Sequence, residues 1–291
     1  MMRILCPTDF SPASQRALRY AIEQLGGGDV EVDVLHVDDV PRHHPFEPAL
    51  ESSLRVSWSE RLDAVVRAHE GATRLTAATR RGHAAPEILA HAAERNVSMI
   101  VMATRSRSAL ERLFLGGVTR KVLRNAQVPV LTVDPDARVA QLRRLLCAVD
   151  LSAGSDAVLE EAVRVAQRVG ARVHLLHVHW LASEAQLVDG TGFLDTRALE
   201  DLRGVAKRDL RALRDRHPSA VVADARIVEG LAHAEVARAV DALEADLLVI
   251  GSHGHGGVWR FMIGSVADRL VRISPVPVLT VRAAREDLDG G

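Results

Sequence analysis

Short apolar runs alternate along the chain with longer segments in which apolar residues recur every three or four positions. Leu145–Val149 is a continuous apolar run, typical of a strand that is covered on both faces of a sheet. Asp150 and Ser152 follow it, and an apolar stripe with helical spacing then begins at Leu159. The stripe continues through Ala162, Val163 and Ala166. Ser152 is therefore predicted to cap the amino terminus of a helix.

The alternation of strand and helix patterns continues through both halves of the chain. Further strands are predicted at 32–37, 75–79, 130–133, 173–178, 221–228, 246–250 and 277–281. In the first half, Ser11 and Pro12 open a helix with the stripe Leu18, Ala21, Ile22 and Leu25, and a second stripe contains Leu54, Trp58, Leu62 and Val65. In the second half, the stripe Leu199, Leu202, Ala206, Leu210 and Leu213 precedes helices at 234–243 and 266–273. This pattern predicts parallel strands joined by right-handed crossovers, an open α/β sandwich in each half.

The chain contains a duplication. The segment ILCPTD at 4–9 returns as LLCAVD at 145–150, Leu-His-Val at 35–37 returns at 176–178, and Pro-Val-Leu-Thr-Val at 129–133 returns at 277–281. A repeat of this length indicates two copies of a whole domain, because solenoid repeats run about 20–50 residues. We expect domains at 1–136 and 142–284 and a disordered tail at 285–291.

A glycine-rich loop, G-x2-G-x9-G-S, follows the fourth strand of the second copy and leads from Gly251 into a helix at Ser265. Glycines let the backbone approach an anion, and a helix amino terminus favours negative charge. The loop lacks the Gly-Lys-Ser/Thr of a P-loop, and Trp259 stands where a dinucleotide fingerprint needs a third glycine. If the first and fourth strands are neighbours, Asp150 and Gly251 share one edge of the sheet. From spacing alone, a nucleotide site and a tight turn without a ligand both stay open.

Taken together, the strand-end aspartates Asp9 and Asp150, the Leu-His-Val and Pro-Val-Leu-Thr-Val segments and the glycine loop resemble a tandem pair of universal stress protein domains. The resemblance covers nearly the whole chain. Its most specific part is the loop, which matches the ATP-binding motif of the family at Gly251, Gly254, Gly264 and Ser265. The resemblance implies two five-stranded parallel sheets of order 3-2-1-4-5 with helices on both faces, a Rossmann-like fold of the adenine-nucleotide hydrolase kind.

The resemblance also implies a ligand, ATP with or without Mg²⁺, and the residues that hold it. Adenine is expected near Asp150 and the backbone of Val178. The ribose and phosphates are expected at the loop, on Gly251, Ser252, His253, Gly254, Gly264, Ser265 and Val266. Family members pair through their fifth strands, which implies an intramolecular pseudo-dimer with 130–133 near 278–281. Whether two chains pair further is left open.

The first copy departs from this pattern. Ala103 and Ser106 replace the first two glycines of the loop, and Gly117 replaces the final serine. A methyl group at Ala103 obstructs close approach of a phosphate. The nucleotide is therefore predicted mainly in the second copy. The arginines of the first loop, Arg105, Arg107 and Arg112, are expected to form a solvated charged surface, and binding of a different anion there stays open.

Composition narrows the function classes. Lys and Arg number 37 against 38 Asp and Glu, and aromatic residues make up 3%, so neither nucleic acid nor a membrane is a predicted partner. No apolar run approaches the roughly 18 residues of a bilayer span, and two cysteines predict reduced thiols in a cytoplasmic protein. The 13 histidines show no zinc spacing, and His36 and His177 hold equivalent places, which favours a structural role at strand ends.

Three functions remain open. The first is an ATP-binding regulatory protein of the stress response, the second a weak ATPase, and the third an interaction scaffold without nucleotide. The intact loop favours the first two. Because neither Asp9 nor Asp150 is accompanied by a paired carboxylate or a Ser-His-Asp arrangement, at most slow ATP hydrolysis is expected.

Overall fold

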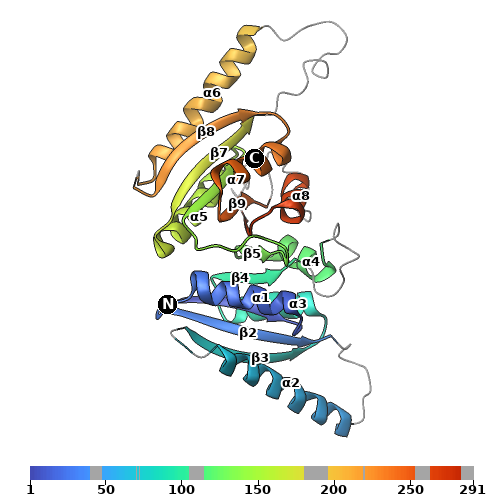
Figure 1. Ribbon diagram of the computed structural model, residues 1–291. Helices are drawn as coiled ribbons and strands as arrows, with labels where there is room; N and C mark the ends of the chain where they lie inside the picture. The colour runs from blue at the N-terminus through green and yellow to red at the C-terminus, as the bar shows by residue number, and fades with distance from the viewer. Residues whose placement is uncertain are drawn as a thin grey trace, which may run out of the picture. The chain divides into compact units, whose positions relative to one another are not determined.

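The computed structural model describes residues 1–39, 48–69, 71, 73–104, 115–179, 196–218, 220–252 and 263–282. The chain divides into two compact units, unit 1 at Met1–Val139 and unit 2 at Ala140–Gly291. The described residues of each unit form five parallel strands with connecting helices (Figure 1). The strand order is β3-β2-β1-β4-β5 in unit 1 and β8-β7-β6-β9-β10 in unit 2, which confirms the predicted order 3-2-1-4-5 in both.

The elements of the two units follow one another in the same sequence. Unit 1 contains β1 (Met2–Thr8), α1 (Pro12–Tyr20), a π-helical turn (Ala21–Leu25), β2 (Val30–Asp38), α2 (Pro48–Ala68), β3 (Arg74–Arg81), α3 (Ala84–Glu94), β4 (Met99–Ala103), α4 (Gly117–Asn125) and β5 (Val130–Val133). Unit 2 contains β6 (Arg144–Val149), α5 (Ser155–Val169), β7 (Arg172–His179), α6 (Thr196–Asp215), β8 (Val222–Glu229), α7 (Ala232–Leu243), β9 (Leu247–Gly251), α8 (Ser265–Ile273) and β10 (Val278–Val281).

The core of each unit lies on both faces of its sheet. Helices α3 and α4 pack against each other on one face, as α7 and α8 do in unit 2, and the right-handed crossovers place the first two helices of each unit on the opposite face. The central strands are buried, and Cys6 and Cys147 are free thiols within them. Burial raises the pKa of both thiols, so they behave as small apolar residues. Among the described residues, no helix combines the length and apolar character that a bilayer crossing requires.

The first helix differs between the units and corrects two predictions. In unit 1, Ser11 caps α1 by accepting a hydrogen bond from the Ser14 amide, but the helix changes to π geometry at Ala21, and Ile22 is only half-buried. In unit 2, α5 begins only at Ser155, and Ser152 does not cap it. The Ser152 hydroxyl donates to Asp150 at 2.7 Å, and α5 begins three residues after Ser152 with Gly154 as its flanking residue, so Ser152 does not stand at the capping position.

The long helix α6 corrects a third prediction. Ala206, Leu210 and Leu213 are buried as the stripe predicted, whereas Leu202 is 51% exposed. The amino-terminal half of α6 extends past the end of β8 (Figure 1), so this part of the stripe has no sheet beneath it. The predicted tail at 285–291 lies outside the described residues.

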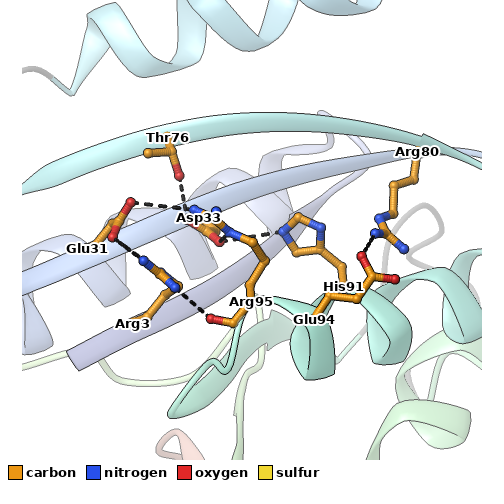
Figure 2. A network of polar contacts seen from close by, with 8 residues as sticks. All are labelled: Arg3, Glu31, Asp33, Thr76, Arg80, His91, Glu94 and Arg95. Carbon is orange, nitrogen blue, oxygen red and sulfur yellow. Dashed lines mark hydrogen bonds and ion pairs between the residues drawn. The ribbon is translucent and has the colours of Figure 1, made fainter. Parts of the chain in front are cut away.

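A buried polar network lies beneath α3 in unit 1 (Figure 2). Asp33 of β2 is 2% exposed and accepts hydrogen bonds from the Thr76 hydroxyl and from Arg95 Nε at 3.1 Å. His91 Nε2 lies 3.5 Å from its Oδ2. Burial raises the pKa of Asp33, but these three partners outweigh burial and hold it well below its ordinary value. The network also contains Arg3, Glu31, Arg80 and Glu94.

Candidate functional site

The predicted site lies at the carboxyl ends of β6 and β9. These strands are neighbours in the unit 2 sheet, with Ala148 in register with Ile250. Asp150 follows the last residue of β6 and Gly251 is the last residue of β9. The two residues therefore share one edge, at the point where the strand order reverses and open α/β sheets bind their ligands.

Asp150 is held by the turn that follows β6. Its Oδ1 accepts hydrogen bonds from the Ser152 amide at 3.0 Å, the Ser152 hydroxyl at 2.7 Å and the Ser155 hydroxyl at 3.2 Å. Leu151, between them, has a φ of 62°, a left-handed conformation that costs a bulky residue about 1–2 kcal/mol. The protein fixes the carboxylate at the edge of the sheet at the cost of backbone strain.

Val178 brings its backbone to the same edge. Val149 is in register with His177, so Val178 lies level with Asp150 on the neighbouring strand. The carbonyl of the next residue, His179, accepts from Gly230 on the β8 side. In a parallel strand, the backbone N–H and C=O groups of successive residues point alternately toward the two neighbouring strands. The backbone groups of Val178 therefore point toward the β6 side, where β6 has already ended.

The base of the glycine loop is closed by backbone hydrogen bonds. The Ser252 amide donates to Val281 at 2.8 Å, and the Gly264 amide donates to the Ser252 carbonyl at 2.8 Å. Ser252 is 3% exposed. The backbone groups of Ser252 and the Gly264 amide thus hold the two ends of the loop together, and among the described residues the next amides that can face a ligand follow Gly264.

Those amides belong to the first turn of α8. Gly264 is its amino-terminal flanking residue, and no side chain caps the helix within the described part of the chain. Ser265 and Val266 are exposed there, and the first N–H groups of a helix have no partner within it. This terminus suits an anion. The predicted His253 and Gly254 lie outside the described residues, so the structure brings together Asp150, Val178, Gly251, Ser252, Gly264, Ser265 and Val266.

Unit 1 repeats this frame. Asp9 Oδ1 accepts from the Ser11 amide at 3.0 Å, and Phe10 has the same φ of 62° as Leu151. The Gly116 amide donates to the Thr104 carbonyl at 2.9 Å, as Gly264 does to Ser252. Burial raises the pKa of Asp9, but hydrogen bonds from Ser11 and Ser14 lower it by more, so the pKa lies below its ordinary value.

The equivalent histidines have the structural role that the sequence favoured. His36 Nδ1 lies 2.9 Å from the Thr8 carbonyl and His177 Nδ1 lies 3.0 Å from the Val149 carbonyl, so each ring ties the second strand to the first. A carbonyl can only accept, so Nδ1 carries the proton in both. The described residues contain no group of three or more His, Cys, Asp or Glu side chains arranged for a metal.

One feature of this edge escaped the sequence patterns. Trp58, expected only as a member of an apolar stripe, stacks on Phe10, which follows the end of β1. Phe10 gave no pattern of its own, because it stands alone between the strand and the helix. The useful signal was the difference between the copies at this position, phenylalanine in one and leucine in the other.

Known proteins resemble this chain in sequence and in fold. A universal stress protein of Mycolicibacterium smegmatis is 28% identical over 293 residues, covering 96% of each chain. One from Mycobacterium tuberculosis is 30% identical over 188 residues, 63% of this chain and 61% of the other. The crystal structure of a universal stress protein from Archaeoglobus fulgidus matches with a TM-score of 0.69 at 26% identity, covering 98% of this chain and 97% of that one. The sequence profile of the universal stress protein family matches twice, at residues 1–134 and 141–282. The chain therefore belongs to the universal stress protein family, as a tandem of two of its domains.

Proposed function

We propose that unit 2 binds ATP and that the protein acts as a nucleotide-binding regulator of the stress response. The observation that carries this proposal is the register of β6 and β9, which brings Asp150 to the same edge as Gly251 and the loop that leads into α8. A carboxylate, exposed backbone at a strand end and an uncapped helix amino terminus at one switch point suit a nucleoside phosphate.

Each group has a distinct part in this proposal. Asp150 accepts hydrogen bonds from the adenosine end of the nucleotide, and the peptide groups of Val178 donate to that end and accept from it. The amides of Ser265 and Val266 and the exposed Ser265 hydroxyl bind phosphate oxygens at the start of α8. A Mg²⁺ ion that enters with ATP takes its ligands from phosphates and water, since Mg²⁺ seldom needs a cage of protein side chains.

Asp150 favours binding over hydrolysis. Three donors bind its Oδ1, an arrangement that orients a carboxylate and stabilises its ionised form. A general base for water would need a carboxylate poised to take up a proton near neutral pH. We therefore expect turnover to be slow at most, and an occupancy-dependent state of unit 2 to be the functional output.

The test uses Gly264→Val with Gly116→Val as its matched control. Gly264 and Gly116 have nearly the same backbone angles, φ −58° and ψ 145° against φ −55° and ψ 141°, which valine also adopts. Neither substitution strains the backbone, so the change in unit 2 is the bulk placed beside the start of α8. Purified protein is denatured and its released nucleotide is quantified by mass spectrometry.

We expect about one ATP per chain in the unmodified protein, none in Gly264→Val and one in Gly116→Val. Two per chain, with loss of one in each variant, would show that unit 1 also binds. No nucleotide after purification and none bound on titration with ATP and Mg²⁺ would contradict the proposal and leave the scaffold function.

A further inference from the structure

Unit 1 carries a packed aromatic cluster at the edge where its nucleotide would lie. The rings of Phe10 and Trp58 are stacked, with centroids 5.7 Å apart and planes at 9°. The His36 ring lies against both, at 4.7 Å from Phe10 and 4.6 Å from Trp58. The Arg61 guanidinium covers the pair, 4.1 Å from the Phe10 centroid and 5.1 Å from that of Trp58. We call Phe10, His36, Trp58 and Arg61 the aromatic cluster.

The cluster adjoins the positions that correspond to the adenosine end of the unit 2 site. Thr8 is in register with His36, so Asp9 and Val37 come next on the two strands. Asp9 and Val37 are the counterparts of Asp150 and Val178. Phe10 directly follows Asp9, and the ring of His36, directly before Val37, supports both aromatic side chains.

Unit 2 has small aliphatic residues where unit 1 has the two aromatic ones. Leu151 replaces Phe10, and both have a φ of 62°, so the two side chains leave the backbone in the same direction. Ala206 replaces Trp58. This correspondence follows from the buried Leu62 of α2 and Leu210 of α6, each 2% exposed and four residues further along its helix.

Packing rather than hydrogen bonding closes the cluster. Trp58 Nε1 and His36 Nε2 are buried, and neither has a hydrogen-bond partner among the residues that the structure describes. Leaving such atoms unpaired opposes folding, so the contacts between the rings and with Arg61 must outweigh it. A planar base entering this edge would have to separate rings that are already stacked on each other.

We propose that Phe10 and Trp58 occupy, in unit 1, the position that the adenine base takes in unit 2. Unit 1 then excludes the base through its own side chains, independently of the changes in its glycine loop. This inference rests on the proposed function of unit 2. Two pairs of equivalent positions, 10 with 151 and 58 with 206, would then distinguish the domain that admits the base from the one that excludes it.

The decisive experiment moves the aromatic pair into unit 2, where the loop is intact. Leu151→Phe with Ala206→Trp is compared with the unmodified protein by calorimetric titration with ATP and Mg²⁺. We expect ATP affinity to fall about 10- to 100-fold, because added volume in a packed position opposes base entry. Val205→Trp is the matched control: Val205 is the next residue on α6 but is 43% exposed, and affinity should stay within about twofold.

A folded double variant that binds ATP as the unmodified protein does would overturn this inference while leaving the proposed function intact. If the unmodified protein binds no ATP, the proposed function fails first and this inference falls with it. Should the double variant not fold, as judged by near-ultraviolet circular dichroism, the reverse change decides. Phe10→Leu with Trp58→Ala should raise adenosine bound at equilibrium dialysis from one to two per chain, and no increase would refute the proposal. Adenosine serves here because it does not depend on the phosphate loop.

Discussion

The two units place different polar groups at the same position beneath their third helices. In unit 1, β2 carries Asp33, which is bound by Thr76 on β3 and by His91 and Arg95 on or next to α3. In unit 2, the position of Asp33 is taken by His174, whose Nδ1 lies 3.0 Å from Asp224 of β8. The α3 positions are replaced by Ala239 and Leu243 of α7.

This difference shows which part of the fold is fixed. Strand order and helix order are the same in both units, and the pairing of β7 with β8 differs from that of β2 with β3 by a register shift between Val173 and His174. The inner strand carries a carboxylate in one unit and an imidazole in the other. At this position both units keep a polar partner for the group on the inner strand, because an unpaired buried charge is far more costly than a paired one. The stability of unit 1 should depend more strongly on that partner than the stability of unit 2, since Asp33 is buried and the His174–Asp224 pair is partly exposed.

The strongest way to test the comparison is to remove one group in each unit. Asp33→Ala should lower the free energy of unfolding of unit 1 by about 3 kcal/mol, because His91 and Arg95 lose the charge that they face. His174→Ala should cost unit 2 about 1 kcal/mol or less. Hydrogen exchange of β2 and β7 peptides measures both in the full chain. Equal losses in the two units would show that the burial of Asp33 has no special weight.

A change of pH tests the same pair without removing atoms. The pKa of Asp33 is lowered from an ordinary value of 3.8, so just below that value the unfolded chain binds more protons than the folded one. Its contribution is complete above about pH 4 and is lost as pH falls through the depressed folded pKa. The pKa of His36 is also lowered, from 6.5, because the effect of burial outweighs the hydrogen bond to Thr8, which raises it. The free energy of unfolding of unit 1 therefore already declines as pH falls below 6.5.

We therefore expect unit 1 to lose stability in two stages between pH 7 and pH 2. Asp33→Asn should reduce the lower stage to the part that Asp9 contributes and keep the upper one, since asparagine does not titrate. Hydrogen exchange of β2 peptides, corrected for the intrinsic pH dependence of exchange, follows both stages. If the loss of stability in the lower stage were unchanged in this variant, other carboxylates would be responsible for the acid sensitivity of unit 1.

The first helices allow a finer comparison. Ser11 caps α1, whereas its counterpart Ser152 donates to Asp150 and leaves α5 uncapped by a side chain. Ser11→Ala should destabilise the first turn of α1 by about 1 kcal/mol, and Ser152→Ala should leave the first turn of α5 unchanged. Amide exchange in the two turns measures the difference. Faster exchange at α5 in Ser152→Ala would mean that the serine does support that helix.

Much of this fold was predictable because parallel strands that are buried on both faces have continuous apolar runs. The adjacency of β6 and β9 was implied only by the family resemblance, since the strand and helix pattern alone left the strand order open. The predictions that failed concerned where a helix begins, changes its geometry or extends past the sheet, and a periodic pattern of apolar residues does not contain this information. Ser152 was predicted to cap α5, but the turn after β6 continues to Gly154 and the helix begins only at Ser155. The π turn at Ala21 has no marker in the apolar pattern. Trp58 matched a core stripe, and only the neighbouring strand end revealed its place over Phe10.

The exposed stripe of α6 gives the smallest expected effect. Helical spacing shows which residues share a face but not how far the sheet extends beneath that face. Leu202 is 51% exposed and Leu210 is 2% exposed, although both belong to one stripe. Leu202→Gln should therefore change the free energy of unfolding of unit 2 by less than about 0.5 kcal/mol, whereas Leu210→Ala should cost about 3 kcal/mol. Urea unfolding followed by exchange of β8 peptides compares the two. A loss at Leu202 as large as that at Leu210 would show that something covers this half of α6 in solution.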